Sequence, residues 1–296
     1  MRMRTILVLA VMTTPLLAAA CGSGTSPAGS PLPVVASTNV YGDIAGQIGG
    51  AHVDVTSVLS DPNADPHLFE PGTRNGLAVS KGRVLIENGV GYDDFMGKLA
   101  NAAPSSDRVV VSIGDALGVR GHDANPHLWY DLPMLPKIAA AIAEGLRTAD
   151  PTHAGAYSAG LRRFTASLAP LQREARAIRA RFAGRAVAYT EPIPGYLLDA
   201  LGLRNLAPAG FTRAIENGSE PSPQAVAGMD ELIRTHRVAA LLYNSQAVSP
   251  ITARVRSESK AAGIPVVGVT ETLPAGLDFQ TWQLRQLREL ERALAR

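Results

Sequence analysis

The feature that most constrains the fold of this chain is an alternation of short apolar runs with helical patterns, which begins at residue 34. The apolar runs are rich in Val, Leu and Ala, and they are short, as strands buried on both faces of a sheet are. They occupy residues 34–37, 52–59, 84–86, 109–112, 186–190, 238–243 and 266–269. Longer stretches with helical spacing lie between some of them, and residues 134–147 are a good example. Such alternation predicts an α/β fold with parallel sheets.

One long helical pattern divides the predicted strands into two groups. Its apolar residues recur at alternating steps of three and four, at Leu161, Phe164, Leu168, Leu171, Ala175, Ile178 and Phe182. This spacing places them on one face of a helix over residues 150–184. Pro170 lies inside the pattern and predicts a kink or a break. We therefore expect two α/β lobes, residues 34–149 and 185–296, joined by this helix as a stiff connector. The alternative is that the helix packs within a single domain.

The N-terminal residues are predicted to be a targeting signal. Arg2 and Arg4 precede two apolar runs that end at Cys21. A charged start, an apolar stretch and small residues before a cleavage point are typical of a signal peptide, here over residues 1–20. A transmembrane anchor is the alternative. Residues 13–15 interrupt the apolar stretch, however, and roughly 20 apolar residues are needed to span a bilayer.

Cys21 stands where a bacterial lipoprotein signal places its lipidated cysteine, although Ala18 occupies a position where leucine is usual. An ordinary secretory signal with an unmodified cysteine is the alternative. Residues 21–33 are rich in Gly, Ser and Pro and predict a flexible tether. We expect the protein to be exported and attached to the outer face of the cell membrane through a lipid on Cys21.

The charge balance argues against nucleic acid as a partner. Residues 21–296 contain 26 basic and 26 acidic side chains, and no polyanion-binding surface follows from such a balance. Cys21 is the single cysteine. It excludes a disulfide framework, a Cys-based zinc site and a thiol redox pair within the chain.

Candidate functional side chains follow the predicted strands. Ligands of open α/β sheets bind beyond the carboxyl ends of the strands. The chain offers two histidines and two glutamates in proline-containing loops, namely His67, His127, Glu191 and Glu271. Two imidazoles and two carboxylates suit Zn(II), Mn(II) or Fe(II) better than Ca or Mg. Four such ligands would fill a tetrahedron and leave little room for a substrate. Each residue alone also has a structural interpretation, as a turn histidine or as an acid at a helix N-terminus.

Longer motifs surround two of these histidines. They read Asp65-Pro-His67-x-x-Glu70-Pro71 and Asn125-Pro-His127-Leu-Trp129. Supporting motifs are Glu87-Asn-Gly-x-Gly-Tyr92, Glu220-Pro-Ser-Pro223 and Glu271-Thr-Leu-Pro274. Over roughly residues 33–296, this pattern resembles the metal-binding receptors of ABC-type zinc and manganese importers. The resemblance implies two α/β lobes joined by a long backbone helix, with one metal ion between them as cargo for a membrane permease. We expect a monomer.

The resemblance also implies a ligand set. His67 and His127 would be the ligands of the first lobe, and Glu191, five residues before Tyr196, the third ligand. Glu271 matches a position that usually carries aspartate. Zinc members commonly have histidine at the third position and a His-rich loop before the second motif, where this chain has only His122. The cargo therefore stays open between Zn(II) and Mn(II), with Fe(II) as a further candidate.

Other residues are candidates for orienting the imidazoles by hydrogen bonds, as partners of metal ligands do. They are Asp65, Glu70, Asp131 and Asn244. For Asp65, an Asx turn is the alternative.

Two other functions remain open from sequence. A secreted metallohydrolase would need an open coordination position and a general base. The chain has no His-Glu-x-x-His helix and no Gly-x-Ser-x-Gly elbow. A surface adhesin has no specific support. We therefore expect a receptor rather than an enzyme.

Overall fold

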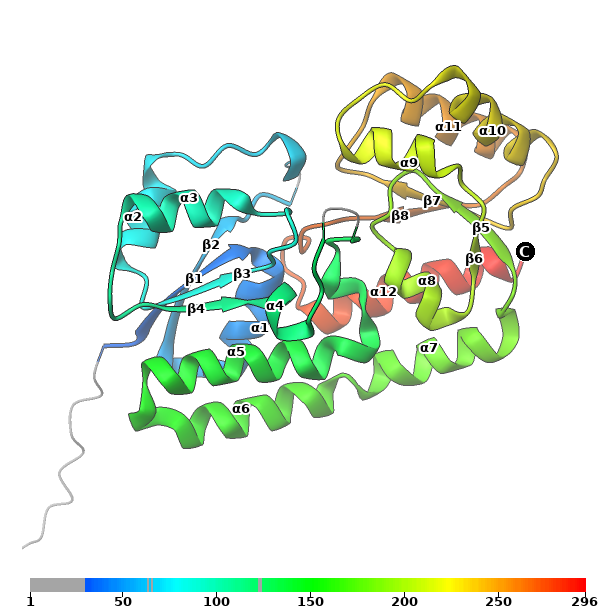
Figure 1. Ribbon diagram of the computed structural model, residues 1–296. Coiled ribbons are helices and arrows are strands. Elements are labelled where there is room, and N and C mark those ends of the chain that lie inside the picture. The colour runs from blue at the N-terminus through cyan, green and yellow to red at the C-terminus, as the bar shows by residue number, and fades with distance from the viewer. Residues whose placement is uncertain (1–29, 63, 65, 122–123) are drawn as a thin grey trace, which may run out of the picture. The chain divides into compact units, whose positions relative to one another are not determined.

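Two four-stranded parallel sheets form the centres of two lobes, as the alternating pattern predicted (Figure 1). The computed structural model describes residues 30–296 except residues 63, 65, 122 and 123. Both sheets are parallel throughout, and residues 31–296 form one compact unit. The expected α/β architecture of two parallel-sheet lobes is confirmed.

The sheet of the first lobe has the strand order β2-β1-β3-β4. Its strands are β1 (Leu32–Thr38), β2 (Val53–Leu59), β3 (Val84–Glu87) and β4 (Val109–Ser112). Its helices are α1 (Asn39–Gly49), α2 (Thr73–Lys81), α3 (Asp94–Ala102), α4 (Ile113–Leu117) and α5 (Leu135–Ala149). Short 3-10 turns are Gly50–His52, Pro66–Leu68, Leu128–Tyr130, Leu132–Met134 and Pro151–His153. Alternate strand residues face opposite sides: Val34 and Val84 belong to the main core, and Val35 and Leu85 to a smaller cluster with Met96 of α3.

The second lobe repeats this order as β6-β5-β7-β8. Its strands are β5 (Ala186–Tyr189), β6 (Arg204–Asn205), β7 (Leu241–Asn244) and β8 (Val266–Val269). Its helices are α8 (Gly195–Leu201), α9 (Ala209–Glu216), α10 (Pro223–Arg234), α11 (Pro250–Ala261) and α12 (Phe279–Leu294). Strand β6 escaped sequence prediction because it is two polar residues long, with no apolar run to mark it.

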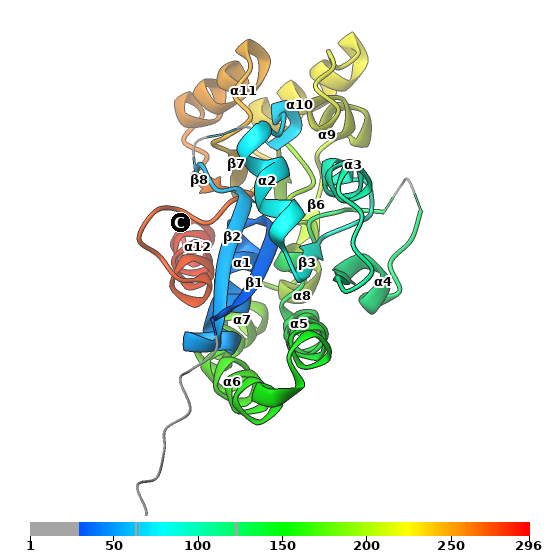
Figure 2. The ribbon, with the colours of Figure 1, turned by 90° about the vertical axis from the view of Figure 1, so that its left-hand side faces the viewer.

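The connector is a pair of helices, α6 (Ala154–Ser167) and α7 (Ala169–Phe182), separated at Leu168. Pro170 is in the first turn of α7. It lacks an N–H for the carbonyl of residue 166, and its ring crowds that carbonyl, which explains the break. Figures 1 and 2 show that α6 and α7 lie on the side of the lobes away from α9–α11.

One hydrophobic core runs through both lobes. It includes Val84 from the first sheet, Phe164 and Ile178 from the connector, and Leu242 from the second sheet. Helix α12 reaches back to α1, where the amide of Phe279 donates to the carboxylate of Asp43 at 3.0 Å. Because separating the lobes would expose this shared apolar surface, wide opening is disfavoured.

The predicted signal peptide and Cys21 lie outside the described residues. Strand β1 begins at Leu32, which pairs with Val53 and is buried. The last two residues of the expected tether, 32 and 33, therefore belong to the sheet. Among the described residues, none of the helices combines the length and the apolar character needed to span a membrane.

Candidate metal site

The strand order of each sheet leaves a crevice where ligands can bind. In the first sheet, β1 lies between β2 and β3. The chain therefore adds its next strand, β2, on one side of β1 and the following strand, β3, on the other. In the second sheet, β5 occupies the same place. A crevice forms at such switch points, at the carboxyl ends of the strands. Glu191, Asn244 and Glu271 lie at this edge of the second sheet, at or just after the ends of β5, β7 and β8.

Asn244 joins the two glutamates. Its Nδ2 donates to Oε2 of Glu191 at 2.6 Å and to Oε1 of Glu271 at 2.9 Å. All three side chains are buried. The backbone of Asn244 is fixed in turn, because its N–H donates to Oγ1 of Thr190 at 3.1 Å. Since an amide supplies hydrogens but no charge, two buried carboxylates beside it make this corner favourable for a cation.

His127 faces the carboxylates from the first lobe. Its side chain is fully buried, and its Nε2 lies 3.3 Å from Oε2 of Glu271. Burial lowers the pKa of His127, but the carboxylates of Glu216 and Glu271 raise it more, so the net pKa lies above its ordinary value. A proton on Nε2 can therefore be shared with Glu271 in the metal-free protein.

Asn125 fixes the tautomer of this imidazole. Its Oδ1 accepts the backbone N–H of His127 at 3.0 Å and lies 2.7 Å from Nδ1. Its Nδ2 donates to the carbonyl of Pro192 at 2.6 Å. The N–H can only donate and the carbonyl can only accept, so the amide orientation is set by the network. Nδ1 therefore carries a hydrogen, and Nε2, whose lone pair becomes free when its proton leaves, faces Glu271.

The same asparagine ties the imidazole to the second lobe. Pro192 directly follows Glu191, and the hydroxyl of Tyr196 donates to the backbone carbonyl of Asn125 at 2.9 Å. A Cβ at Gly195 would lie only 2.7 Å from Nδ2 of Asn125, so glycine leaves room for this contact. Sequence reasoning included Asn125 in a motif but assigned it no role, because the position of Pro192 follows only from the fold.

Aromatic rings enclose the imidazole. Tyr92 and Trp129 meet His127 edge to face, with ring centroids 5.8 and 5.4 Å away. The hydroxyl of Tyr92 also donates to Oε2 of Glu271 at 3.2 Å. Before Tyr92 the backbone is strained, because Val90 has a φ of 58°, which is unfavourable for a β-branched residue. Such strain is found where a local conformation serves a site.

Gln246 brings the loop that carries the first histidine motif to the carboxylates. Its Nε2 donates to the carbonyl of Pro62 at 2.8 Å, and its Oε1 accepts the N–H of Glu271 at 2.5 Å. The 3-10 turn Pro66–Leu68 follows in the same loop. The side chain of His67 and all of Asp65 lie outside the described part of the structure, as does His122. Sequence reasoning assigned no role to Gln246.

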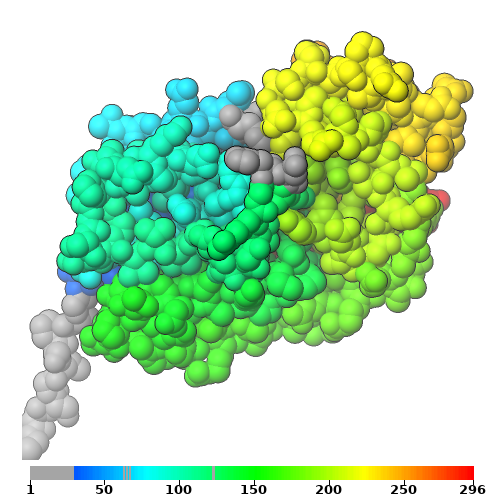
Figure 3. Space-filling model, viewed as in Figure 1, coloured from blue at the N-terminus to red at the C-terminus, as the bar shows by residue number. Residues whose placement is uncertain are grey.

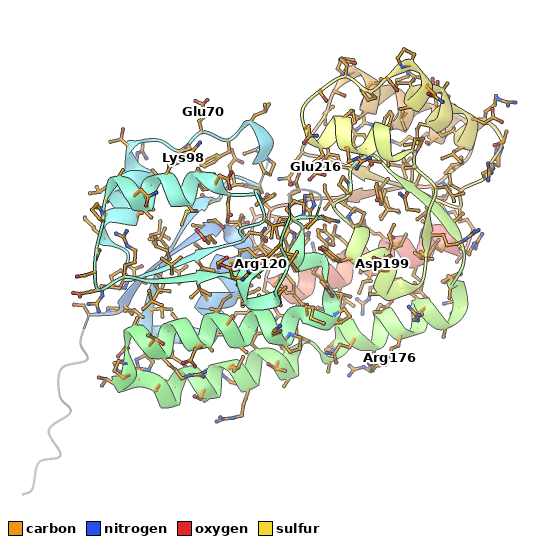
Figure 4. The ribbon with its side chains drawn as sticks, in the orientation of Figure 1. Glu70, Lys98, Arg120, Arg176, Asp199 and Glu216 are labelled. Atoms are coloured by element: carbon orange, nitrogen blue, oxygen red, sulfur yellow. The ribbon has the colours of Figure 1, made fainter. Side chains whose placement is uncertain are left out.

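The remaining candidates for orienting the imidazoles lie differently. Asn244 contacts both glutamates. Glu70 is exposed, on the loop before α2 (Figure 4). Asp131 begins the turn Leu132–Met134, and burial raises its pKa. Among described side chains, neither Glu70 nor Asp131 forms a hydrogen bond with His127. Within that same set, which omits His67, no three His, Cys, Asp or Glu residues form a group that could hold a metal ion.

A cleft of about 740 Å³ opens at the junction of the two lobes. Tyr92 and Asn125 line it from the first lobe, and Tyr189, Pro192 and Glu216 from the second. Figure 4 places Glu216 at the junction of the lobes. His127, Glu191 and Glu271 do not line the cleft, but Tyr92 and Asn125, which contact His127, do.

Two parallel-sheet lobes on a shared helical connector, with buried imidazole and carboxylate groups at their junction, define a two-lobed solute-binding protein. The family model "Zinc-uptake complex component A periplasmic" matches residues 34–293, and the chain belongs to this family.

Individual relatives agree with this assignment. The chain is 32% identical over 167 residues to the manganese-binding lipoprotein MntA of Halalkalibacterium halodurans, with 55% of each chain covered. It is 26% identical over 258 residues to the manganese ABC transporter substrate-binding lipoprotein PsaA of Streptococcus anginosus, with 82% of each chain covered. The solved structure of FpvC from Pseudomonas aeruginosa in complex with Mn2+ has a TM-score of 0.75 at 22% identity, with 90% of this chain and 98% of that chain covered. This last likeness concerns the fold.

Proposed function

We propose that this chain is an extracytoplasmic receptor that captures one divalent transition metal ion and delivers it to an ABC-type membrane permease. The observation that carries the proposal is the buried contact between Nε2 of His127 and Glu271, with Glu191 held beside it through Asn244. An imidazole nitrogen and two carboxylates from separate lobes form a donor set for such an ion. The names and family of the relatives support the same function.

The full ligand set that we propose is His67, His127, Glu191 and Glu271. His67 is included because of its motif and because Gln246 holds the backbone of its loop next to Glu271. The ion would replace the proton shared by His127 and Glu271, and capture would therefore release a proton. The lone pair that Asn125 directs outward from the imidazole is the one that would bind.

The cargo is Zn(II) or Mn(II), with Fe(II) as a further candidate. Four monodentate ligands from this set suit tetrahedral Zn(II). Bidentate binding by the glutamates would raise the coordination number to one that Mn(II) or Fe(II) prefers.

Binding takes place without turnover. Four protein ligands leave no open position for a catalytic water, which is what a secreted metallohydrolase would require. A surface adhesin would need no buried imidazole and carboxylates. Metal-dependent hydrolysis by the purified protein would contradict this proposal.

The chain is proposed to act as a monomer on the outer face of the cell membrane. Residues 1–20 would be removed as a signal peptide, and Cys21 would carry the lipid. The proposed lobes are residues 34–149 and 185–296, with residues 150–184 as the connector. The names of relatives as lipoproteins support the anchor.

Elemental mass spectrometry tests the function. Residues 22–296 are stripped of metal, offered equimolar Zn(II), Mn(II) and Fe(II) without oxygen, and desalted. We expect one equivalent of one metal in total. Retention of no metal would contradict the receptor function. Retention of Mn(II) or Fe(II) against the intrinsic order of affinities would identify a selective site, whereas Zn(II) is favoured by that order.

A further inference from the structure

The charges of this chain are distributed unevenly over the fold. Residues 154–182, which form α6 and α7 of the connector, contain six arginines and one glutamate, a net charge of +5. The rest of residues 21–296 contains 20 basic and 25 acidic side chains, a net charge of −5. The equal overall counts therefore conceal a basic segment and an acidic remainder.

Four of these arginines form what we call the basic face. They are Arg162 and Arg163 of α6 and Arg173 and Arg176 of α7. All four are exposed, and none forms an ion pair with a side chain in the described part of the chain. By contrast, Arg181 is paired with Glu291. The basic face thus consists of cations that form no ion pair with the acidic side chains that the structure describes.

The helices that carry the basic face lie along one side of the molecule. Figures 1 and 2 agree that α6 and α7 run beneath both lobes, and Figure 3 shows this segment in green as a continuous lower surface. Arg176 projects from α7 away from the lobes in Figure 4. The candidate site belongs to the opposite side of the connector, at the junction of the lobes. A surface that binds the basic face would therefore leave that junction uncovered.

The point where the tether joins the fold lies at one end of this face. Leu32 at the start of β1 pairs with Val53. The neighbouring His52 stacks on His153, directly before α6, with ring centroids 4.1 Å apart. The ten residues 21–30 span at most about 36 Å when fully extended. The connector is about 43 Å long at 1.5 Å per residue. A lipid on Cys21 would therefore hold this end of the connector within a few tens of ångströms of the membrane.

We propose that the basic face rests on the anionic lipid headgroups of the membrane that holds the anchor. This inference depends on the lipid attachment proposed for Cys21. Clustered arginines are attracted to an anionic leaflet within a Debye length of its surface, about 8 Å at physiological salt. A lipid chain and a basic patch together anchor a protein more firmly than either does alone. With the connector against the membrane, the loops on the other side of both lobes face outward, where they can meet metal ions. Delivery to the permease then requires the receptor to leave this position.

Vesicle co-sedimentation tests the proposal without the anchor. Residues 22–296, which retain the whole compact unit, are mixed with vesicles of phosphatidylglycerol and phosphatidylcholine, or of phosphatidylcholine alone. We expect binding to the anionic vesicles only, and weakening with added salt. Replacing Arg162, Arg163, Arg173 and Arg176 by Gln should reduce binding about tenfold or more. A matched variant replaces four exposed basic residues elsewhere, namely Arg74, Arg83, Lys98 and Arg237, and should bind nearly as wild type does.

Several results would overturn the proposal. They are absence of wild-type binding at low salt, equal binding to neutral vesicles, and equal loss in the two variants. Binding to a soluble polyanion but not to anionic vesicles would assign the face to a different partner and also overturn it. Each protein is loaded with Zn(II) in parallel. Failure of the wild-type protein to bind Zn(II) would count against the receptor function. Failure to bind vesicles, with Zn(II) binding intact, would count only against the proposal for the basic face.

Discussion

The two lobes share one strand order, but they hold their halves of the candidate site by different means. An asparagine stands at the same place in each sheet, Asn88 directly after β3 and Asn244 at the end of β7. Asn88 donates to the carbonyl of Pro126 at 2.9 Å and accepts from the hydroxyl of Tyr41. It therefore fixes the backbone of a loop. Asn244 donates instead to two carboxylates.

This difference indicates which half of the site depends on supporting contacts. Glu191 and Glu271 follow strand ends directly, so the second sheet positions them. His127 lies on a loop far from any strand, and its position depends on hydrogen bonds made by Asn88 and Asn125. We expect the first lobe to tolerate loss of such contacts less well than the second.

The largest effect should come from removing a proposed ligand of either lobe. His127→Ala and Glu271→Ala each delete a donor atom and should weaken metal binding by more than the roughly 10–100-fold that loss of an orienting partner costs. His67→Ala should do the same. Competition titration against a chelator measures these affinities, with His236→Ala, a change at an exposed histidine, as the control. Wild-type affinity in either the His127 or the His67 variant would disprove that residue's place in the ligand set.

The next effect should come from Asn125 in the first lobe. Asn125→Leu removes the acceptor for Nδ1 of His127 and the donor to Pro192, so affinity should fall roughly 10–100-fold. Asn125→Asp keeps the acceptor and loses only the donor, so its affinity should fall less. The ¹⁵N resonances of the metal-free imidazole should report hydrogen on Nδ1 in wild type and in Asn125→Asp, and a mixture of tautomers in Asn125→Leu. Equal loss of affinity in the two variants would show that the imidazole is not oriented by this acceptor.

A third test compares the two equivalent asparagines directly. Asn88→Ala and Asn244→Ala each leave buried polar groups without a partner, which should lower the free energy of unfolding of the metal-free protein by about 1–3 kcal/mol. A bound cation can offset the repulsion between Glu191 and Glu271 once Asn244 is lost, but it cannot replace the contacts of Asn88. Thermal unfolding with and without Zn(II) should therefore show a larger metal-induced rise in melting temperature for Asn244→Ala than for wild type. A larger rise for Asn88→Ala would reverse the comparison.

The sequence predicted the parts of this molecule that depend on patterns along the chain. Apolar runs marked both sheets, and the rule for strand ends selected Glu191 and Glu271. The roles of Asn125 and Gln246 were not predictable, because they arise from carbonyls of Pro192 and Pro62 that only the fold brings near. Equal counts of basic and acidic residues likewise gave no sign of the basic face, since counting ignores where charges lie. The place of His67 among the ligands stays a prediction.

The smallest effect concerns a proton at the boundary between the lobes. Glu216 is not a proposed ligand, yet its carboxylate raises the pKa of His127 across the junction, together with Glu271 and against the effect of burial. In the metal-free protein, His127 should therefore titrate above the ordinary value of about 6.5, as followed by NMR. Glu216→Gln should lower that pKa toward the ordinary value. An unchanged pKa would show that Glu216 does not act on the imidazole.

The sign of this shift also predicts how stability and metal binding change with pH. A raised folded-state pKa means that protonated His127 stabilises the metal-free fold. This contribution is fully present below a pH of about 6.5 and is lost as the pH rises through the folded-state pKa. Metal binding has the opposite dependence, because the ion must displace the same proton. Urea unfolding in the presence of chelator should show wild type losing more stability than Glu216→Gln as the pH rises through that range.

Calorimetry in buffers of different ionisation enthalpy should show a proton released on metal binding below the raised pKa and less release above it. In the metal-free protein, one proton links Nε2 of His127 in the first lobe to Glu271 in the second. When capture of the metal releases this proton, the ion would join the two lobes in its place.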